Sequence, residues 1–257
     1  MSNSKTGFYS RTFGRLFGQV GPEIWGFVGS GILLAFVLSS RIGYVGTAGE
    51  SYSFLNHFIS ELGQVGVSHL APLFNTGLIL GGFVSVVFMV GLGMYIKNTA
   101  AKIAMGVGVF SGIACMLVGC FPMNNLHTHT IVATCFFVSG MLTVAIFSVA
   151  IARQKEARIP RLFSIAGVIV VGIFIAFLIN SHLLGLGFAH GPSALSVISA
   201  RPHIWWRTIL EWGVFIAIVG WMLLMSICIY IMNRKPNRTS GKTQAILKPS
   251  IPSSSIP

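Results

Sequence analysis

Residues 70–96 read LAPLFNTGLILGGFVSVVFMVGLGMYI, an apolar segment that contains no charged side chain. A helix needs about 20 apolar residues to cross the hydrocarbon core of a bilayer, so this segment is long enough to span a membrane. Small residues let neighbouring helices approach closely, and the segment contains Gly77, Gly81, Gly82, Gly91 and Gly93. We therefore predict a membrane-spanning helix that packs tightly against its neighbours.

Five further apolar runs have a similar length, at approximately 22–40, 102–121, 130–151, 162–180 and 208–232. The composition agrees with a membrane protein, because 54% of the residues are hydrophobic and only 9% are charged. A soluble domain carries about 25% charged residues. We predict an all-α integral membrane protein, a bundle of six transmembrane helices in contact with the lipid bilayer. A short outer amphipathic helix is expected between spans one and two.

The basic residues predict the orientation in the membrane. If all six runs span, the termini and the connections alternate between two sides, and 14 of the 17 Lys and Arg fall on the side of the termini. Since basic loops remain in the cytoplasm, both termini are predicted to be cytoplasmic. On the outer side, three Arg (Arg41, Arg201 and Arg207) face three Glu (Glu50, Glu61 and Glu211). The net charge of +12 is thus a topology signal, and no nucleic-acid partner is predicted.

Three regions follow from this pattern. Residues 1–20, basic and rich in Phe, read as a cytoplasmic arm with an amphipathic tendency. Residues 21–232 form the six-span membrane domain. Residues 233–257 are rich in Pro, Ser and Lys and are predicted to be a disordered cytoplasmic tail.

The stretch FLNHFISELG at 54–63 places a His, a Ser and a Glu within five positions of an otherwise apolar chain. On a helix, His57 and Glu61 are one turn apart and Ser60 lies on the same face. A carboxylate near the membrane is costly without a partner. We expect this stretch to fold inward as a cap, turning Ser60 and Glu61 toward His127 or His129 and the mouth of the last span.

All seven histidines fall in outer connections or at outer helix ends: His57, His69, His127, His129, His182, His190 and His203. The orientation rule counts Lys and Arg, so it does not force neutral histidines outward. Imidazole binds metals and transfers protons near neutral pH. The asymmetry therefore predicts a functional site at the outer face.

The candidate residues of this site fall into three groups. The candidate catalytic residues are Ser60, Glu61, Arg207 and Glu211, and the candidate ligand-binding residues are His57, Asn75, Arg201 and Trp206. The candidate metal ligands, for a divalent metal such as zinc, are His57, His127, His129 and His182.

Each candidate has a plain structural alternative. A loop histidine is often simply solvated, and Arg207 with Glu211 at one-turn spacing is also a common ion pair at a helix end. His127 and His129 share one side of an extended segment but diverge on a helix. The sequence contains neither a His-Glu-x-x-His nor a Cys-x-x-Cys zinc signature.

Several short motifs resemble a known family. They are Ser60-Glu61-Leu62-Gly63, Leu73-Phe74-Asn75-x-Gly77, Gly119-x-Phe121-Pro122 followed by His127 or His129, and Arg207-x-x-x-Glu211-Trp212. This pattern resembles the prokaryotic six-span membrane family catalogued as domain of unknown function 998, which is distantly similar to the Frag1/DRAM/Sfk1 proteins, some of them linked to lipid remodelling. The resemblance covers residues 20–232 and implies a prokaryotic inner or plasma membrane, but no activity. Glu61 stands where related proteins often carry Asp.

Three functions fit these observations. The first is a membrane-embedded enzyme, such as a metallohydrolase, that acts on a lipid or lipid-linked substrate at the outer leaflet. Either a histidine-bound metal activates water with Glu61 as general base, or Ser60 is a nucleophile with a His as base. The second is a non-enzymatic transporter, sensor or assembly partner that binds a ligand at the outer polar cap; the uncharged middles of the spans argue against an ion-coupled carrier. The third is haem binding by His127 or His129 with His182.

Overall fold

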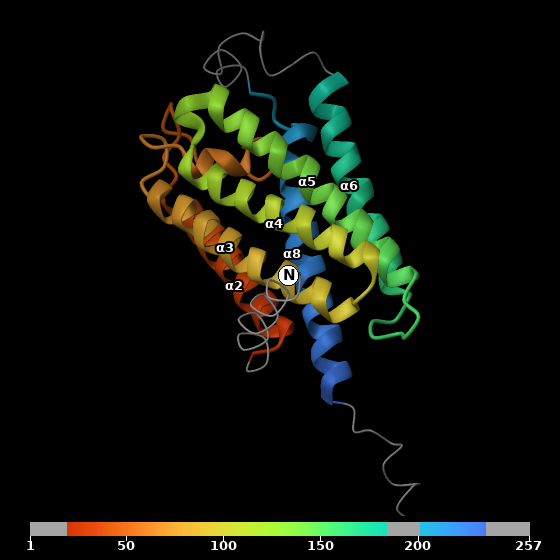
Figure 1. The fold of residues 1–257 in the computed structure, drawn as a ribbon. Coiled ribbons are helices and arrows are strands. Elements are labelled where there is room, and N and C mark those ends of the chain that lie inside the picture. The colour runs from red at the N-terminus through yellow and green to blue at the C-terminus, as the bar shows by residue number, and fades with distance from the viewer. Residues whose placement is uncertain (1–19, 184–200, 235–257) are drawn as a thin grey trace, which may run out of the picture.

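The computed structural model describes residues 20–183 and 201–234, and this part of the chain is helical (Figure 1). The long helices are α2 (Pro22–Ser40), α3 (Ala71–Ile96), α4 (Thr99–Cys120), α5 (Leu126–Ala152), α6 (Phe163–Leu183) and α8 (Trp206–Arg234). Three short 3-10 helices accompany them, namely η1 (Arg41–Gly43), η2 (Ile59–Gly63) and η3 (Met123–Asn125). The predicted arm at 1–20 and most of the predicted tail lie outside the described residues.

All six long helices are long and apolar enough to cross a membrane, which confirms the six-span prediction. Two of them begin earlier than the apolar runs because asparagines cap them. The Asn98 side chain accepts a hydrogen bond from the N–H of Ala101 at 2.8 Å, and the Asn125 side chain accepts one from the N–H of Thr128 at 3.2 Å. Such caps satisfy N–H groups that the first helical turn leaves free.

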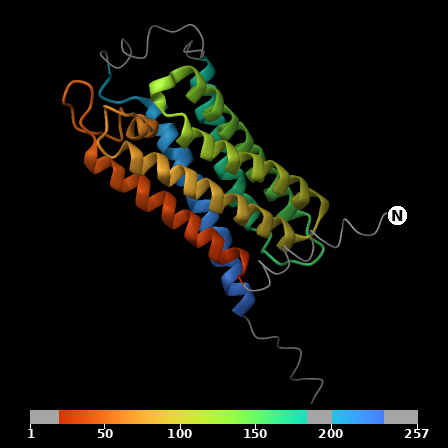
Figure 2. The same cartoon turned by 60° about the vertical axis from the view of Figure 1, so that its left-hand side comes forward.

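The six helices form a closed ring. Consecutive helices from α2 to α6 pack side by side, and α8 closes the ring between α6 and α2 (Figures 1 and 2). Residues 41–70, which we call the cap, lie across one end of the bundle (Figure 2). That end also carries residues 121–126 and 201–206, and we call it the cap end.

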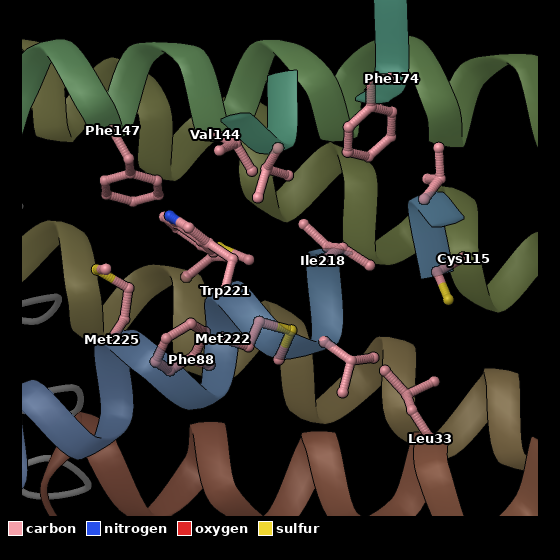
Figure 3. Close-up of a cluster of buried hydrophobic side chains, with 14 of the residues drawn as sticks. Leu33, Phe88, Cys115, Val144, Phe147, Phe174, Ile218, Trp221, Met222 and Met225 are labelled. Carbon is pink, nitrogen blue, oxygen red and sulfur yellow. The ribbon is translucent and has the colours of Figure 1, made fainter. Parts of the chain in front are cut away.

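The interior of the ring is packed around α8 (Figure 3). The Trp221 ring lies 5.9 Å from the Phe147 ring of α5, and Phe88 of α3 lies on the other side, near Met222. All four side chains are buried. The side chains that face away from this core are large and apolar as well, including Phe83, Ile103 and Val168, so the outer surface of the bundle suits lipid.

Two glycines explain why α3 and α4 pack so closely. A Cβ atom built on Gly82 would lie 2.8 Å from the carbonyl oxygen of Gly112, and one built on Gly112 would lie 3.0 Å from that of Gly82. The two backbones therefore touch, as the glycine-rich sequence predicted. By contrast, a Cβ on Gly106 of the same helix α4 would meet open space.

The helix expected at 54–63 is shorter than predicted, and its burial agrees with the expected inward fold of this stretch. Only Ile59–Gly63 is helical, as the 3-10 helix η2, and all five of its residues are buried. His57 precedes this helix, in a turn where its N–H donates to the Ser53 carbonyl at 3.0 Å. The segment is a plug held beneath the surface, because partners on α3, α8 and residue 201 satisfy its polar groups from within.

Backbone hydrogen bonds hold the cap together. The N–H of His69 donates to the Gly43 carbonyl at 2.7 Å, which joins the two ends of the cap. The Asn124 side chain makes two bonds of 2.9 Å with the N–H and the carbonyl of Val65. The N–H of Trp205 donates to the Leu55 carbonyl at 2.8 Å. Three connections far apart in the sequence are thus fastened to one another at the cap end.

Candidate functional site

Glu61 and Arg201 form a buried ion pair under the cap. Two guanidinium nitrogens of Arg201 donate to the two carboxylate oxygens of Glu61, at 3.0 and 3.1 Å. Only 1% of Glu61 is exposed. Arg201 also donates to the Asn56 carbonyl at 2.7 Å. This paired geometry is the strongest form of an arginine–carboxylate contact, and it ties the last connection to the cap.

Two further donors complete the shell around Glu61. The Tyr44 hydroxyl donates to Oε2 at 2.8 Å, and the N–H of Phe58 donates to Oε1 at 2.8 Å. Burial and the adjacent Glu61 charge raise the pKa of Tyr44, so this hydroxyl keeps its proton. For Arg201, burial lowers the pKa, but the hydrogen bonds and the charge of Glu61 outweigh it and the pKa is raised. Glu61 therefore has four donor contacts that fix its position.

Glu211 on α8 is a second buried carboxylate, with 6% of the residue exposed. Its Oε2 accepts from the N–H of Ile59 at 2.9 Å, and its Oε1 accepts from the Ser60 hydroxyl at 3.2 Å. Arg207, one turn earlier, places its guanidinium 5.6 Å from the centre of the Phe58 ring. Glu211 thus anchors the first turn of η2 to the last span.

His57 is buried between two tyrosine rings, with 3% of the residue exposed. The rings of Tyr44 and Tyr52 each lie 5.2 Å from the imidazole. Its Nδ1 lies 3.2 Å from the Ser53 nitrogen and 2.8 Å from the Asn56 Oδ1. Its Nε2 finds no hydrogen-bond partner within the described residues and lies 4.0 Å from Glu50 Oε1.

The charges around His57 act in opposite directions. Burial lowers its pKa, and the Arg201 charge adds to this, whereas the charges of Glu61 and Glu50 raise it; the net direction is downward. Glu50 itself has a lowered pKa, because backbone N–H bonds, among them one of 2.8 Å from Ala48, outweigh its burial. The neutral imidazole is therefore the form that this site favours.

An aromatic wall separates the cap from α8. The Trp212 indole N–H donates to the Tyr52 hydroxyl at 2.8 Å, and that hydroxyl donates to the Phe58 carbonyl at 3.0 Å. Trp212 itself is buried, with 4% of the residue exposed. Trp206 is 66% exposed, as expected of a residue at a membrane interface.

His127 and His129 do not converge. Both lie in the first turn of α5, where His127 is exposed and His129 is buried. The Nδ1 of His129 lies 2.8 Å from the Phe121 carbonyl oxygen, so Nδ1 carries the proton and donates. The helical register, which the sequence left open against an extended segment, decides this separation.

A cavity of about 100 Å³ lies between α2, α3, α4, α5 and α8. Ile59 and Ser60 of η2 contribute to its wall, as do Leu78, Met89 and Phe137 deeper in the bundle. The wall is almost wholly apolar. The lining residues with polar side chains are Ser60, Ser85, Ser111, Cys115, His129, Thr143 and Glu211. Ser60, His129 and Glu211 come from the cap or from helix turns next to it, and we call this part of the cavity its polar end.

The expected contacts of the cap are right for Ser60 and wrong for Glu61. Ser60 reaches the mouth of the last span at Glu211, whereas Glu61 pairs with Arg201 and Tyr44 rather than with a histidine. Asn75 donates from Nδ2 to the Gly63 carbonyl at 3.0 Å and thereby fixes the end of η2.

The metal and nucleophile hypotheses find little support in these contacts. Among the described residues no group of three His, Cys, Asp or Glu side chains could hold a metal ion. The side chain of His182, and the whole of His190, lie outside the described residues. The Ser60 hydroxyl donates to Glu211 rather than to a histidine. His69 and His203 are exposed.

Sequence reasoning missed Tyr44, Tyr52, Asn56 and Glu50 as members of this site. Tyrosines and a lone glutamate in a connection carry no local signal, since their neighbours in the sequence are Gly, Ser and Val. The one usable hint was the charge balance, because three Arg and three Glu on one side of a membrane are expected to pair.

Comparison with known proteins agrees with the motif resemblance. A family model described as a protein of unknown function (DUF998) matches residues 28–228, from within α2 to within α8. No curated protein and no solved structure matches the chain.

Breaking the Glu61–Arg201 pair is expected to loosen the cap. We predict that Glu61→Gln and Arg201→Gln each lower the free energy of unfolding by about 3–5 kcal/mol, because each leaves a buried group without its partner. The double variant should lose less than the sum of the two. Chemical denaturation in detergent micelles measures these differences.

The matched control is Glu156→Gln, which removes a carboxylate that is 84% exposed and lies 3.5 Å from Arg158. Its cost should stay within about 1 kcal/mol. Equal losses for Glu61→Gln and for this control would show that the buried pair does not hold the cap.

The lowered pKa of His57 predicts a dependence of stability on pH. Because the folded pKa lies below the ordinary 6.5, the unfolded chain binds the proton first. Stability is thus full above pH 6.5 and is lost as the pH falls through the folded value. The melting temperature in detergent should fall between neutral and mildly acidic pH, and the fall should shrink in His57→Gln. The exposed His127→Gln should retain the wild-type profile; identical profiles for both variants would contradict the assignment.

Proposed function

We propose that this chain, which belongs to the DUF998 family of proteins of unknown function, is a multi-pass membrane protein that binds a lipid or lipid-linked molecule inside its helix bundle. The hydrocarbon chain of the ligand lies in the apolar body of the cavity. Its head lies at the polar end, beside Ser60, His129 and Glu211. The observation that carries the proposal is this cavity, whose wall is almost wholly apolar and whose lining includes Ser60, His129 and Glu211 near the cap end.

The shape of the cavity supports a narrow ligand. Its volume of about 100 Å³ is smaller than an engineered cavity of about 150 Å³ that binds benzene. A short segment of one unbranched hydrocarbon chain fits such a space, and the remainder of a longer chain would extend out of it toward lipid. A second chain or a fused ring system does not fit. The same argument weighs against haem, whose macrocycle exceeds the volume between these helices.

The polar end supports binding of a head group. Binding pockets combine an apolar wall with a few polar groups that orient the ligand. Here Ile59 and Ser60 hold the Glu211 side chain, and the Phe121 carbonyl holds the His129 side chain. Both polar side chains are therefore fixed in position before a ligand binds. Such preorganisation reduces the entropic cost of binding.

The cap end faces outward in this proposal, because the basic residues gather at the opposite end. We expect a membrane-impermeant maleimide to label Ser51→Cys, an exposed cap position, in intact cells. Ala157→Cys, exposed at the opposite end, should be labelled only after the cells are opened. Both changes are made in a Cys120→Ser background, since Cys120 is exposed. Labelling of Ala157→Cys alone in intact cells would reverse the orientation.

Filling the cavity should abolish ligand binding. Ala133 of α5 lines the cavity, and Ala133→Phe would place a ring in the space that the chain of the ligand needs. We expect purified wild-type protein in amphipol to bind radiolabelled single-chain amphiphiles, and Ala133→Phe to weaken this binding by about tenfold or more. Scintillation proximity measures the dissociation constant.

The matched control is Ala176→Phe, which makes the same substitution at an exposed position of α6, toward lipid. Its affinity should equal that of the wild type. If Ala133→Phe binds as tightly as Ala176→Phe, the ligand does not occupy this cavity. If the wild type binds no amphiphile, the proposed function is wrong.

A further inference from the structure

We infer that the cavity selects an amphiphile whose head donates hydrogen bonds and carries no negative charge, such as a long-chain alcohol or amine, over one with a carboxylate or phosphate head. The inference rests on the proposed function and names the class of its ligand. It follows from which hydrogen-bonding groups the polar end of the cavity has left to offer.

Most hydroxyl groups along the cavity already donate a hydrogen bond to another group of the protein. Ser85 donates to the Gly81 carbonyl and Thr143 donates to the Ser139 carbonyl, each at 2.7 Å within its own helix. The Ser60 hydroxyl donates to Glu211. A ligand that needs donors from these side chains would have to break a bond that already exists.

The capacity that remains at the polar end is acceptor capacity. An ionised carboxylate has about four lone-pair sites, and the N–H of Ile59 and the Ser60 hydroxyl use two of those on Glu211. His129 donates through Nδ1 to the Phe121 carbonyl, so its neutral ring presents Nε2 to a ligand as an acceptor. The head group that complements these atoms is a donor.

The charged residues near the cavity also disfavour an anionic head group. Glu211 is the sole Asp, Glu, Lys or Arg among the residues that line the cavity. Arg201 is bound to Glu61, Arg207 lies over the Phe58 ring, and Arg41 lies 5.1 Å from the centre of the Phe54 ring. None of these three lines the cavity. An anionic head would therefore stand next to a carboxylate in a medium of low dielectric constant, where repulsion between like charges is strong.

A head group that is a positively charged or neutral donor interacts favourably with the polar end. An ammonium head forms a charge-assisted hydrogen bond with Glu211, and a hydroxyl head donates to Glu211 or to His129. The chain below the head then follows the apolar wall past Leu78, Met89 and Met222. Head and chain are thus matched by two different parts of one cavity.

The test compares dodecanol, dodecylamine and dodecanoate, which share one chain and differ in the head. The measurements use wild-type protein in amphipol at about pH 9, where a buried carboxyl group is ionised and an alkylamine is still protonated. Dodecylamine and dodecanol should then bind at least about tenfold more tightly than dodecanoate, since placing two like charges side by side costs several kcal/mol. Glu211→Gln should erase this preference by weakening the amine and strengthening dodecanoate. The same substitution at the exposed Glu156 should leave the order unchanged.

A second variant guards against a folding defect in Glu211→Gln. Glu211→Asp keeps the carboxylate and should restore the preference for the amine over dodecanoate that Glu211→Gln loses. Dodecanoate that binds wild type as tightly as the amine, or a Glu211→Asp variant without preference, overturns the inference about the head group while leaving chain binding intact. If none of the three binds wild type, the proposed function itself falls.

Discussion

The Glu61–Arg201 ion pair is the interaction on which the cap end of this protein depends. Desolvation makes a buried charge costly, and a bidentate partner with further donors offsets that cost. Arg201 and Tyr44 both bind the Glu61 carboxylate, so one side chain joins the end of the first span, the cap and the connection before the last span. The pair also explains the neutral balance of Arg and Glu on this side of a strongly basic chain.

The second carboxylate, Glu211, extends this arrangement into the bundle. It accepts from the backbone of η2 and from Ser60, and it borders the cavity from α8. Glu61 is held by a cation and two further donors, whereas Glu211 keeps free acceptor sites next to an apolar space. Two carboxylates of the same cap end therefore have different surroundings, and the one beside the cavity is the better candidate for ligand contact.

The six spans and the family were predictable from the sequence, because each depends on short-range properties. A run of about 20 apolar residues identifies a span wherever it packs, and motifs such as Ser60-Glu61-Leu62-Gly63 are read along the chain. The helix expected at 54–63 forms only at Ile59–Gly63, and the burial of this segment agrees with its predicted inward fold. The pairing of His127 with His129 depended on whether residues 126–130 were helical, and the Asn125 cap decided it.

The sequence by itself determined that the chain is a six-span helical membrane protein and that the connections on one side of the spans gather histidines and balanced charges. Only the tertiary structure decided that Glu61 binds Arg201, that Ser60 binds Glu211, and that His129 lines a cavity while His127 does not. These partners lie up to about 150 residues apart. Hydropathy acts locally and is readable in one segment, whereas a hydrogen bond between distant residues exists only after the ring of helices has closed.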